Sequence, residues 1–170
     1  MFIGKKIASI GKALSMNVLI AERKGAASTR DGRAAFWNAI EKGTIFVTAT
    51  PLDASTRDLL SSEEFQRMDR SAFVINVGRG GVINEAALAQ ALLDGQIGGA
   101  ATDVFAHEPA TTENCPLLDP KIPNLVLTPH AAWYSARTIK GTQATVKANI
   151  EGFVAGKPQN LVIDKGRDCT

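Results

Sequence analysis

Cysteine is scarce in this chain of 170 residues, which contains only Cys115 and Cys169. Two cysteines at this separation form neither a disulfide framework nor the paired ligands of a zinc site. We expect both to be free thiols, which is typical of proteins in the reducing cytoplasm. No metal site is expected.

Long apolar runs and blocks of one charge are missing as well. No apolar stretch approaches the roughly 20 residues that a transmembrane helix needs. The first residues, MFIGKKIA, lack the apolar region of a signal peptide. The 19 basic and 17 acidic residues leave a net charge of +2 and no basic stripe, which argues against nucleic acid as a partner. These absences favour a cytoplasmic globular protein with no membrane association, at a length typical of one domain.

The chain does contain an alternation of helical and strand-like segments. Five short apolar runs are expected to be strands, at residues 18–21, 44–48, 72–77, 99–105 and 124–127. They are apolar throughout and not at every second residue, which is typical of parallel strands buried on both faces. Helical patterns lie at 3–14, 34–42 and 85–94, with a capping-box start at Ser61 and Glu64 and a long helix after Ser135. The pattern predicts an α/β fold with a doubly wound parallel sheet.

The last predicted helix carries a mostly apolar stripe. Its members recur at spacings of three and four residues and therefore share one face: Ile139, Gln143, Val146, Ile150 and Phe153. We expect this face to dock on a sheet.

Polar residues follow each predicted strand. They are Glu22, Thr50 with Pro51, the turn Gly78-Arg79-Gly80-Gly81, Asp103 with Glu108, and His130. The carboxyl ends of parallel strands meet at one edge of a sheet, and ligands bind in the crevice outside that edge. These groups are therefore expected to converge on one site.

Glu22 is the candidate for recognising a nucleotide ribose. It ends a predicted strand about 18 residues after Gly4, near the spacing of the acidic residue that bonds an adenosine ribose in dinucleotide-binding folds. Its carboxylate would accept both ribose hydroxyls and repel a 2′-phosphate, which favours NAD over NADP. Arg23 and Lys24 weaken that preference, since either could meet a phosphate. The alternative is a solvated loop acid.

Arg79, His130 and Glu108 are the candidates for chemistry. A guanidinium placed between glycines can clamp a carboxylate with two hydrogen bonds and polarise an adjacent carbonyl. Histidine gives or takes a proton near neutral pH, and a carboxylate such as Glu108 would hold its ring. The alternatives are a surface arginine in a turn and a structural histidine. His107 is expected to be solvated, and Asp103 could instead cap nearby backbone amides.

Several motifs of the chain resemble those of a known family. They are NVGRGGVINEAAL (76–88), GGAATDVFAHEP (98–109) and NLVLTPHAAW (124–133), together with NVLIAERKGA (17–26) and TPLDASTRDLLSSEEFQRM (50–68). The chain thereby resembles the NAD-binding domain of the D-isomer-specific 2-hydroxyacid dehydrogenases, especially the glycerate dehydrogenase and hydroxypyruvate reductase branch. The resemblance implies a Rossmann-like fold and an NAD-dependent oxidoreductase. Its reaction would interconvert a 2-keto acid, such as hydroxypyruvate or glyoxylate, and the D-2-hydroxy acid.

The resemblance also implies a role for each candidate residue. Arg79 would bind and polarise the substrate, His130 would be the general acid/base, and Glu108 would pair with it. The residues implied for the cofactor are Ile3 and Gly4 at the phosphate-binding turn, Glu22 at the adenosine ribose, Thr50 and Pro51 on the adenine side, Thr56, the backbone of Val77, Gly78 and Arg79, Asp103 at the nicotinamide carboxamide, and His130.

The match is incomplete at the N-terminus. Of the family's GxGxxG turn only Ile3-Gly4 remains, and the strand before that turn has no counterpart. We therefore expect a partial dinucleotide-binding domain over residues 1–157 and a tail over 158–170 that returns toward an absent substrate domain. We also expect another chain, as in a homodimer, to cover the open strand position. The alternative function is a catalytically inactive module that binds nucleotide or dimerises.

Overall fold

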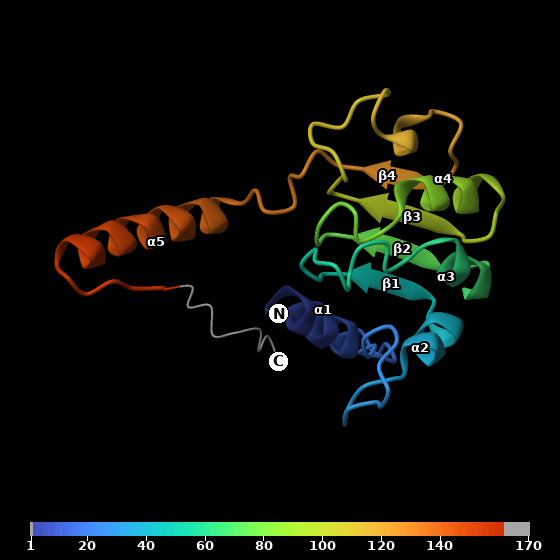
Figure 1. Cartoon of the computed structure of the whole chain (residues 1–170), viewed down its shortest axis with the longest axis horizontal. Coiled ribbons are helices and arrows are strands. Elements are labelled where there is room, and N and C mark those ends of the chain that lie inside the picture. Colours follow the sequence, from blue (N-terminus) through green and yellow to red (C-terminus); the bar gives the residue numbers. More distant parts are fainter. Residues whose placement is uncertain (1, 162–170) are drawn as a thin grey trace. The chain divides into compact units, whose positions relative to one another are not determined.

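The computed structural model describes residues 2–161, with side chains from residue 3 onward. Its elements are α1 (Phe2–Ala13), α2 (Phe36–Lys42), β1 (Ile45–Thr48), α3 (Ser62–Arg67), β2 (Phe73–Asn76), α4 (Glu85–Leu93), β3 (Gly99–Thr102), the 3-10 turn η1 (Pro116–Leu118), β4 (Leu125–Leu127) and α5 (Ala136–Val154) (Figure 1). The chain divides into two compact units between Ala132 and Trp133. Each unit is described by itself.

The first unit is built on a parallel sheet of four strands in the order β1-β2-β3-β4. The register is continuous across the sheet, because Val47 pairs with Ile75, Ile75 with Ala101, and Ala101 with Val126. All four carboxyl ends therefore meet at one edge, where the polar candidates were expected to gather. The predicted α/β class is confirmed.

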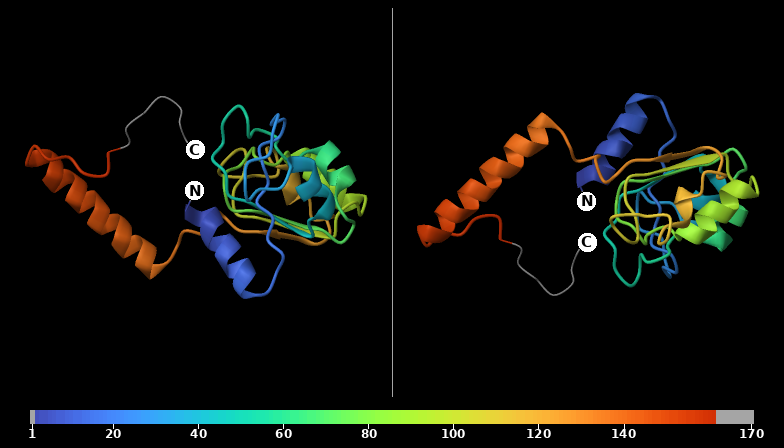
Figure 2. Two further views of the ribbon diagram at one scale, coloured as in Figure 1. Left: turned by 90° about the horizontal axis from the view of Figure 1, so that it is seen from below. Right: turned by 90° about the horizontal axis from the view of Figure 1, so that it is seen from above.

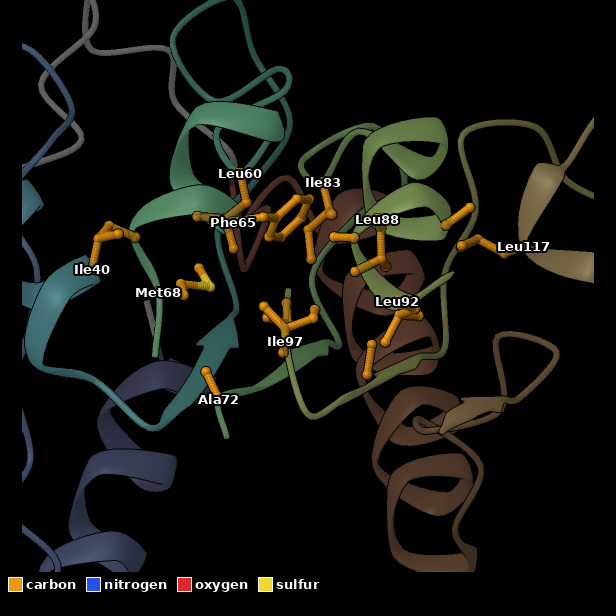
Figure 3. Close-up of a cluster of buried hydrophobic side chains, with 14 of the residues drawn as sticks. Ile40, Leu60, Phe65, Met68, Ala72, Ile83, Leu88, Leu92, Ile97 and Leu117 are labelled. Atoms are coloured by element: carbon orange, nitrogen blue, oxygen red, sulfur yellow. The ribbon is translucent and has the colours of Figure 1, made fainter. Parts of the chain in front are cut away.

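One face of this sheet is covered by helices. Val74 of β2 and Ala100 of β3 are buried beneath α3 and α4, which lie side by side (Figure 2). Phe65 of α3 and Leu88 of α4 are the centre of this core (Figure 3). Burial of each such side chain contributes roughly 1.5–3 kcal/mol to folding, so this layer is the main source of the unit's stability.

The opposite face of the sheet is apolar but exposed. Ile45, Val47, Phe73 and Val126 all point to this face and are each more than a third exposed. Among the described residues of the first unit, helices α2, α3 and α4 thus bury one face of the strands. The sequence pattern predicted strands buried on both faces, whereas in the described part of the first unit one face of the sheet is exposed.

Helix starts follow the predicted capping residues. The Glu64 carboxylate accepts the backbone N–H of Ser61 at 3.0 Å, which completes the capping box of α3. The Asn84 side chain accepts from the N–H of Ala87 at the start of α4. Ser135 Oγ accepts from Thr138 at the start of α5. Each cap satisfies a backbone donor that has no partner within its helix.

The predicted strand at residues 18–21 is wrong. Only Ala21 is paired, in an isolated parallel bridge with Ala34, and Leu19 and Ile20 are exposed. The outer edge of β1 has no partner strand among the described residues, so this segment has no neighbouring strand with which to extend a ladder. An apolar run alone therefore did not suffice to form a strand.

The second unit contains α5. The predicted helix is confirmed, and Val146, Ile150 and Phe153 of its stripe are exposed within this unit. Docking of the stripe on a sheet stays a prediction. Cys169 and most of the predicted tail lie outside the described residues, whereas Cys115 is a buried free thiol. No helix in the described part of the chain is both long and apolar enough to cross a membrane.

Candidate functional site

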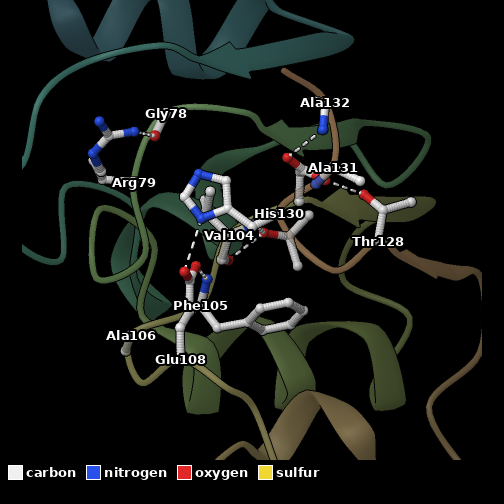
Figure 4. Close-up of polar contacts among 12 residues, drawn as sticks. Gly78, Arg79, Val104, Phe105, Ala106, Glu108, Thr128, His130, Ala131 and Ala132 are labelled. Atoms are coloured by element: carbon white, nitrogen blue, oxygen red, sulfur yellow. Dashed lines mark hydrogen bonds and ion pairs between the residues drawn. The ribbon is translucent and has the colours of Figure 1, made fainter. Parts of the chain in front are cut away.

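His130 and Glu108 form a direct pair at the carboxyl edge of the sheet. The Nδ1 atom of His130 lies 2.8 Å from Oε2 of Glu108, while Oε1 of the same carboxylate accepts the N–H of Phe105 at 3.0 Å (Figure 4). The imidazole is 40% exposed. The pairing at Nδ1 leaves Nε2 with no hydrogen-bond partner among the described residues. The ring is therefore held at one nitrogen and open at the other.

The charge of Glu108 is stabilised by its neighbours. The hydrogen bond from His130 and then that from the Phe105 amide lower the pKa of the Glu108 carboxyl below its usual value, against a smaller opposing effect of burial. The positive charge of Arg79 acts in the same direction. Glu108 is thus an anion at neutral pH.

Asp103 holds the loop that carries His130. Its carboxylate accepts the hydroxyl of Thr128 at 2.5 Å and the N–H groups of Ala131 and Ala132 at 2.8 and 2.9 Å. Burial alone would raise the pKa of Asp103, but these hydrogen bonds outweigh it and the pKa is lowered. The carboxylate thus accepts hydrogen bonds from residues on both sides of His130. This agrees with the alternative interpretation of Asp103 as a cap for nearby backbone amides. Its expected contact with the nicotinamide stays a prediction.

Arg79 sits in a turn shaped by Asn76, a residue that the sequence analysis missed. The buried amide of Asn76 donates to the Arg79 carbonyl at 3.0 Å and accepts the N–H of Gly78 at 3.1 Å. The Arg79 side chain is exposed, and its guanidinium donates to the carbonyl of Gly78. A side-chain amide that bonds its own backbone two residues on is the usual behaviour of asparagine in turns. This behaviour of asparagine is the feature of the sequence from which the role of Asn76 could have been predicted.

Two further contacts bring the Arg79 turn and the Glu108 loop together. A Cβ on Gly80 would lie only 1.8 Å from the carbonyl oxygen of Phe105, so only glycine permits this approach. The Glu85 carboxylate accepts the N–H of Ala106 at 2.6 Å. Glu85 lies in the first turn of α4, and its hydrogen bond to the loop was not predicted from the sequence. His107 is exposed, as expected.

Glu22 is not a solvated loop acid. It is 5% exposed, and its carboxylate accepts four hydrogen bonds, from the backbone of Arg23 and from the backbone and side chain of Arg30. The Arg30 side chain is the largest cause of a strongly lowered Glu22 pKa, and burial opposes it. The carboxylate is placed at the end of the 18–21 segment, as a ribose ligand requires, but it already has a partner.

Thr50 provides a test of whether the site suits a nucleotide. Its hydroxyl is the one buried side-chain oxygen or nitrogen without a hydrogen-bond partner in the described part of the chain. A buried hydroxyl without a partner costs free energy unless a ligand satisfies it. Beside it, a Cβ on Gly78 would meet the Thr50 backbone at 2.9 Å, so the chain is closely packed there. Thr56 donates to the Pro51 carbonyl at 2.7 Å and closes the adjacent loop.

The remaining residues predicted to bind the cofactor are Val77, Ile3 and Gly4, which would do so through backbone groups. Val77 continues β2 by donating its N–H to the Thr48 carbonyl. Ile3 and Gly4 lie in the first turn of α1, where backbone N–H groups have no partner within the helix and suit a phosphate. Together with Thr50 and Glu22, these groups fit a dinucleotide. No cluster of His, Cys, Asp and Glu within residues 2–161 could hold a metal ion.

A parallel α/β sheet with Arg79, Glu108 and His130 after its strands has the architecture of a Rossmann-like dinucleotide-binding domain. Residues 2–132 match the family model described as "D-isomer specific 2-hydroxyacid dehydrogenase, NAD binding domain". The chain belongs to the family of D-isomer specific 2-hydroxyacid dehydrogenases. The family model names NAD, which confirms the predicted cofactor at the level of the family.

Individual proteins agree with the family assignment. The chain is 41% identical over 160 residues to the glycerate dehydrogenase of Methylorubrum extorquens, covering 94% of this chain and 49% of that protein. A structure of D-lactate dehydrogenase with NAD+ from Lactobacillus jensenii superposes with a TM-score of 0.81 at 24% identity over 95% of this chain and 52% of that one, which shows the fold alone. A probable 2-hydroxyacid dehydrogenase from Rhizobium etli in complex with NADP, HEPES and L(+)-tartaric acid gives a TM-score of 0.70 at 30% identity over 95% and 52%.

The chain spans about half the length of the curated relatives that it matches. The depression along α5, lined by residues such as Val146 and Ile150, lies in the second unit and contains none of the predicted site residues. The candidate site is therefore the carboxyl edge of the sheet in the first unit.

Proposed function

We propose that this chain carries the cofactor-binding and acid/base part of an NAD(H)-dependent oxidoreductase that interconverts a 2-keto acid, such as hydroxypyruvate or glyoxylate, and its D-2-hydroxy acid. The His130–Glu108 pair is the observation that carries the proposal. A histidine held at Nδ1 by a carboxylate and open at Nε2 has the arrangement that a general acid/base requires. The similarity to a glycerate dehydrogenase supports the substrate class.

The residues of the chain divide the chemistry as follows. When it is bound, the nicotinamide supplies or accepts the hydride at the carbon that carries the oxygen. In the reductive direction Nε2 of His130 gives a proton to the keto oxygen, and Glu108 stabilises the imidazolium before that transfer. The guanidinium of Arg79 holds the substrate carboxylate and offsets the negative charge that develops on the oxygen.

The supporting groups keep these atoms in place. Asp103 holds the backbone on both sides of His130, and Asn76 holds the turn of Arg79. The amides at the start of α1 would bind the pyrophosphate, and the Thr50 hydroxyl would gain the partner that it lacks. We further propose that a second chain pairs with the outer edge of β1, because edge strands carry unpaired backbone groups.

The proposal is tested by NADH oxidation, measured as the loss of absorbance at 340 nm after addition of hydroxypyruvate or glyoxylate. We expect Arg79→Lys to lower kcat/KM about a hundredfold or more, because a lysine cannot form the paired hydrogen bonds of a guanidinium. Arg70→Lys is the matched control, since Arg70 is an exposed arginine outside the site. Equal rates for wild type and Arg79→Lys would contradict the proposal. A chain that binds NADH without any turnover would favour the nucleotide-binding module.

A further inference from the structure

The carboxylate of Glu22 is saturated with donors. Oε1 accepts the N–H of Arg23 at 2.9 Å and Nη2 of Arg30 at 2.6 Å. Oε2 accepts the backbone N–H of Arg30 at 3.2 Å and Nε of the same residue at 2.8 Å. An ionised carboxylate offers about four lone-pair positions, so none remains for a ligand.

An adenosine ribose can therefore bind Glu22 only by displacing a donor. The two hydroxyls of a ribose need two acceptor positions. Two of the four present donors belong to the backbone and are fixed by the loop, and the other two are the forked side chain of Arg30. This side chain is 48% exposed and can swing out, whereas Glu22 is buried. Arg30 and an unmodified ribose thus compete for the same two positions.

A second arginine lies beside Glu22. Arg33 is on the same side of Glu22, with its Nε 3.9 Å from Oε2 and its Nη1 donating to the Ala21 carbonyl. The bridge between Ala21 and Ala34 closes the base of the loop at residues 22–33, which carries both arginines beside Glu22. Guanidinium groups bind phosphate oxygens in pairs of parallel hydrogen bonds.

We propose that Arg30 is a specificity-determining residue, which competes with the adenosine ribose of NAD(H) for Glu22 and binds the 2′-phosphate of NADP(H). The proposal rests on the proposed function, since it takes the adenosine ribose to lie at Glu22. The chain then accepts NADP(H) in addition to NAD(H). Glu22 alone would favour NAD(H) over NADP(H), and Arg30 offsets this preference.

The test is a calorimetric titration of the whole chain with NADH, NADPH, adenosine 2′,5′-bisphosphate and 5′-AMP, for wild type and Arg30→Met. Methionine keeps an apolar stem and removes the guanidinium. We expect Arg30→Met to bind NADPH and the bisphosphate at least tenfold more weakly and NADH severalfold more tightly. Binding of 5′-AMP, which lacks the 2′-phosphate, should follow NADH. Arg70→Met is the matched control and should leave all four dissociation constants unchanged.

A second variant keeps the test decisive if Arg30→Met folds poorly. Glu22→Gln removes the carboxylate that attracts both the ribose and Arg30, so it should weaken NADH binding and leave NADPH binding equal or tighter. If Arg30→Met lowers the affinity for all four ligands equally, or lowers the affinity for NADH, the inference is overturned. Arg30 would then be only a structural partner of Glu22. If the bisphosphate responds as expected but neither dinucleotide supports turnover, the proposed function fails and the role of Arg30 stands.

Discussion

At the carboxyl edge of β2, β3 and β4 the candidate reactive groups are exposed or partly exposed, and buried groups hold them. In the loop at residues 22–33 the arrangement is reversed, because the candidate ligand Glu22 is itself buried and a partly exposed arginine covers it. Both clusters lie in the first unit and both follow strand-like segments.

The two clusters differ in whether a ligand would have to displace a protein group before it can bind. His130 has one ring nitrogen paired and the other open, so a proton can move without any displacement of the protein. A ribose that binds at Glu22, as we propose, must first displace Arg30. Free energy spent on that release lowers cofactor affinity, whereas the acid/base pair requires no such change.

Loss of the Asp103 carboxylate should have the largest effect on stability. Asp103→Ala leaves the Thr128 hydroxyl and two amides without their acceptor in a buried place, and we expect the free energy of unfolding to fall by about 2–4 kcal/mol. Urea denaturation followed by circular dichroism measures the change. Asp103→Asn is the matched variant and should lose less, since one acceptor oxygen remains. Equal stability of Asp103→Ala and wild type would show that the edge is not held as described.

Loss of the ion pair that anchors the loop at residues 22–33 should have the next largest effect on stability. Lys24 joins the loop at residues 22–33 to α3 through Glu64, which is 0% exposed, at 2.6 Å. Lys24→Met leaves that carboxylate buried without its cation, and we expect a loss of about 1–3 kcal/mol on urea denaturation. Lys121→Met, at an exposed lysine, should change stability by less than about 0.5 kcal/mol. A loss as small as that of the control would mean that the loop is not anchored through α3.

Glu85 offers a smaller and purely positional test of the catalytic edge. Glu85→Gln weakens the hydrogen bond to the Ala106 amide, and we expect about 0.5–1.5 kcal/mol of lost stability with a fall in kcat and little change in KM. Steady-state kinetics with NADH and hydroxypyruvate would separate the two parameters. A change confined to KM would indicate a role in binding and not in positioning the Glu108 loop.

The smallest expected effect is a pH dependence. The folded pKa of Glu108 lies below its unfolded value, so its contribution to stability is complete above the unfolded pKa of about 4.5 and is lost as the pH falls through the folded pKa. The carboxylate is partly exposed, which limits the effect to less than about 1 kcal/mol. The difference in denaturation midpoint between wild type and Glu108→Gln should shrink from pH 6 to pH 3. A constant difference would show that Glu108 gains nothing from ionisation.

Most of the fold could be predicted from local patterns. The strands from Ile45 onward and the helices with a side-chain cap, such as α4 behind Asn84, follow from apolar runs and capping residues that act within a few positions. The segment at 18–21 could not be predicted in this way. A strand forms only where a neighbouring strand can pair with it, and the local sequence does not show whether such a neighbour exists.

The candidate site was predictable where it depended on topology. Arg79, Glu108 and His130 were expected at one edge because parallel strands place their carboxyl ends together, and the pair of His130 with Glu108 follows. The partner of Glu22 was not predictable, since Arg30 reaches it through the path of an irregular loop. The hydrogen bond of Glu85 to Ala106 spans 21 residues and was not predictable either, whereas the local hydrogen bonds of Asn76 follow the usual behaviour of asparagine in turns.

The central claim is that His130 transfers the proton, and it is tested most directly by comparing NADH oxidation with hydroxypyruvate for wild type, His130→Ala and His107→Ala. His107 is the matched control, because it is exposed, whereas His130 is paired with Glu108. We predict that kcat falls by about 10²–10⁴-fold in His130→Ala and is unchanged in His107→Ala. A wild-type rate retained in His130→Ala would contradict the account.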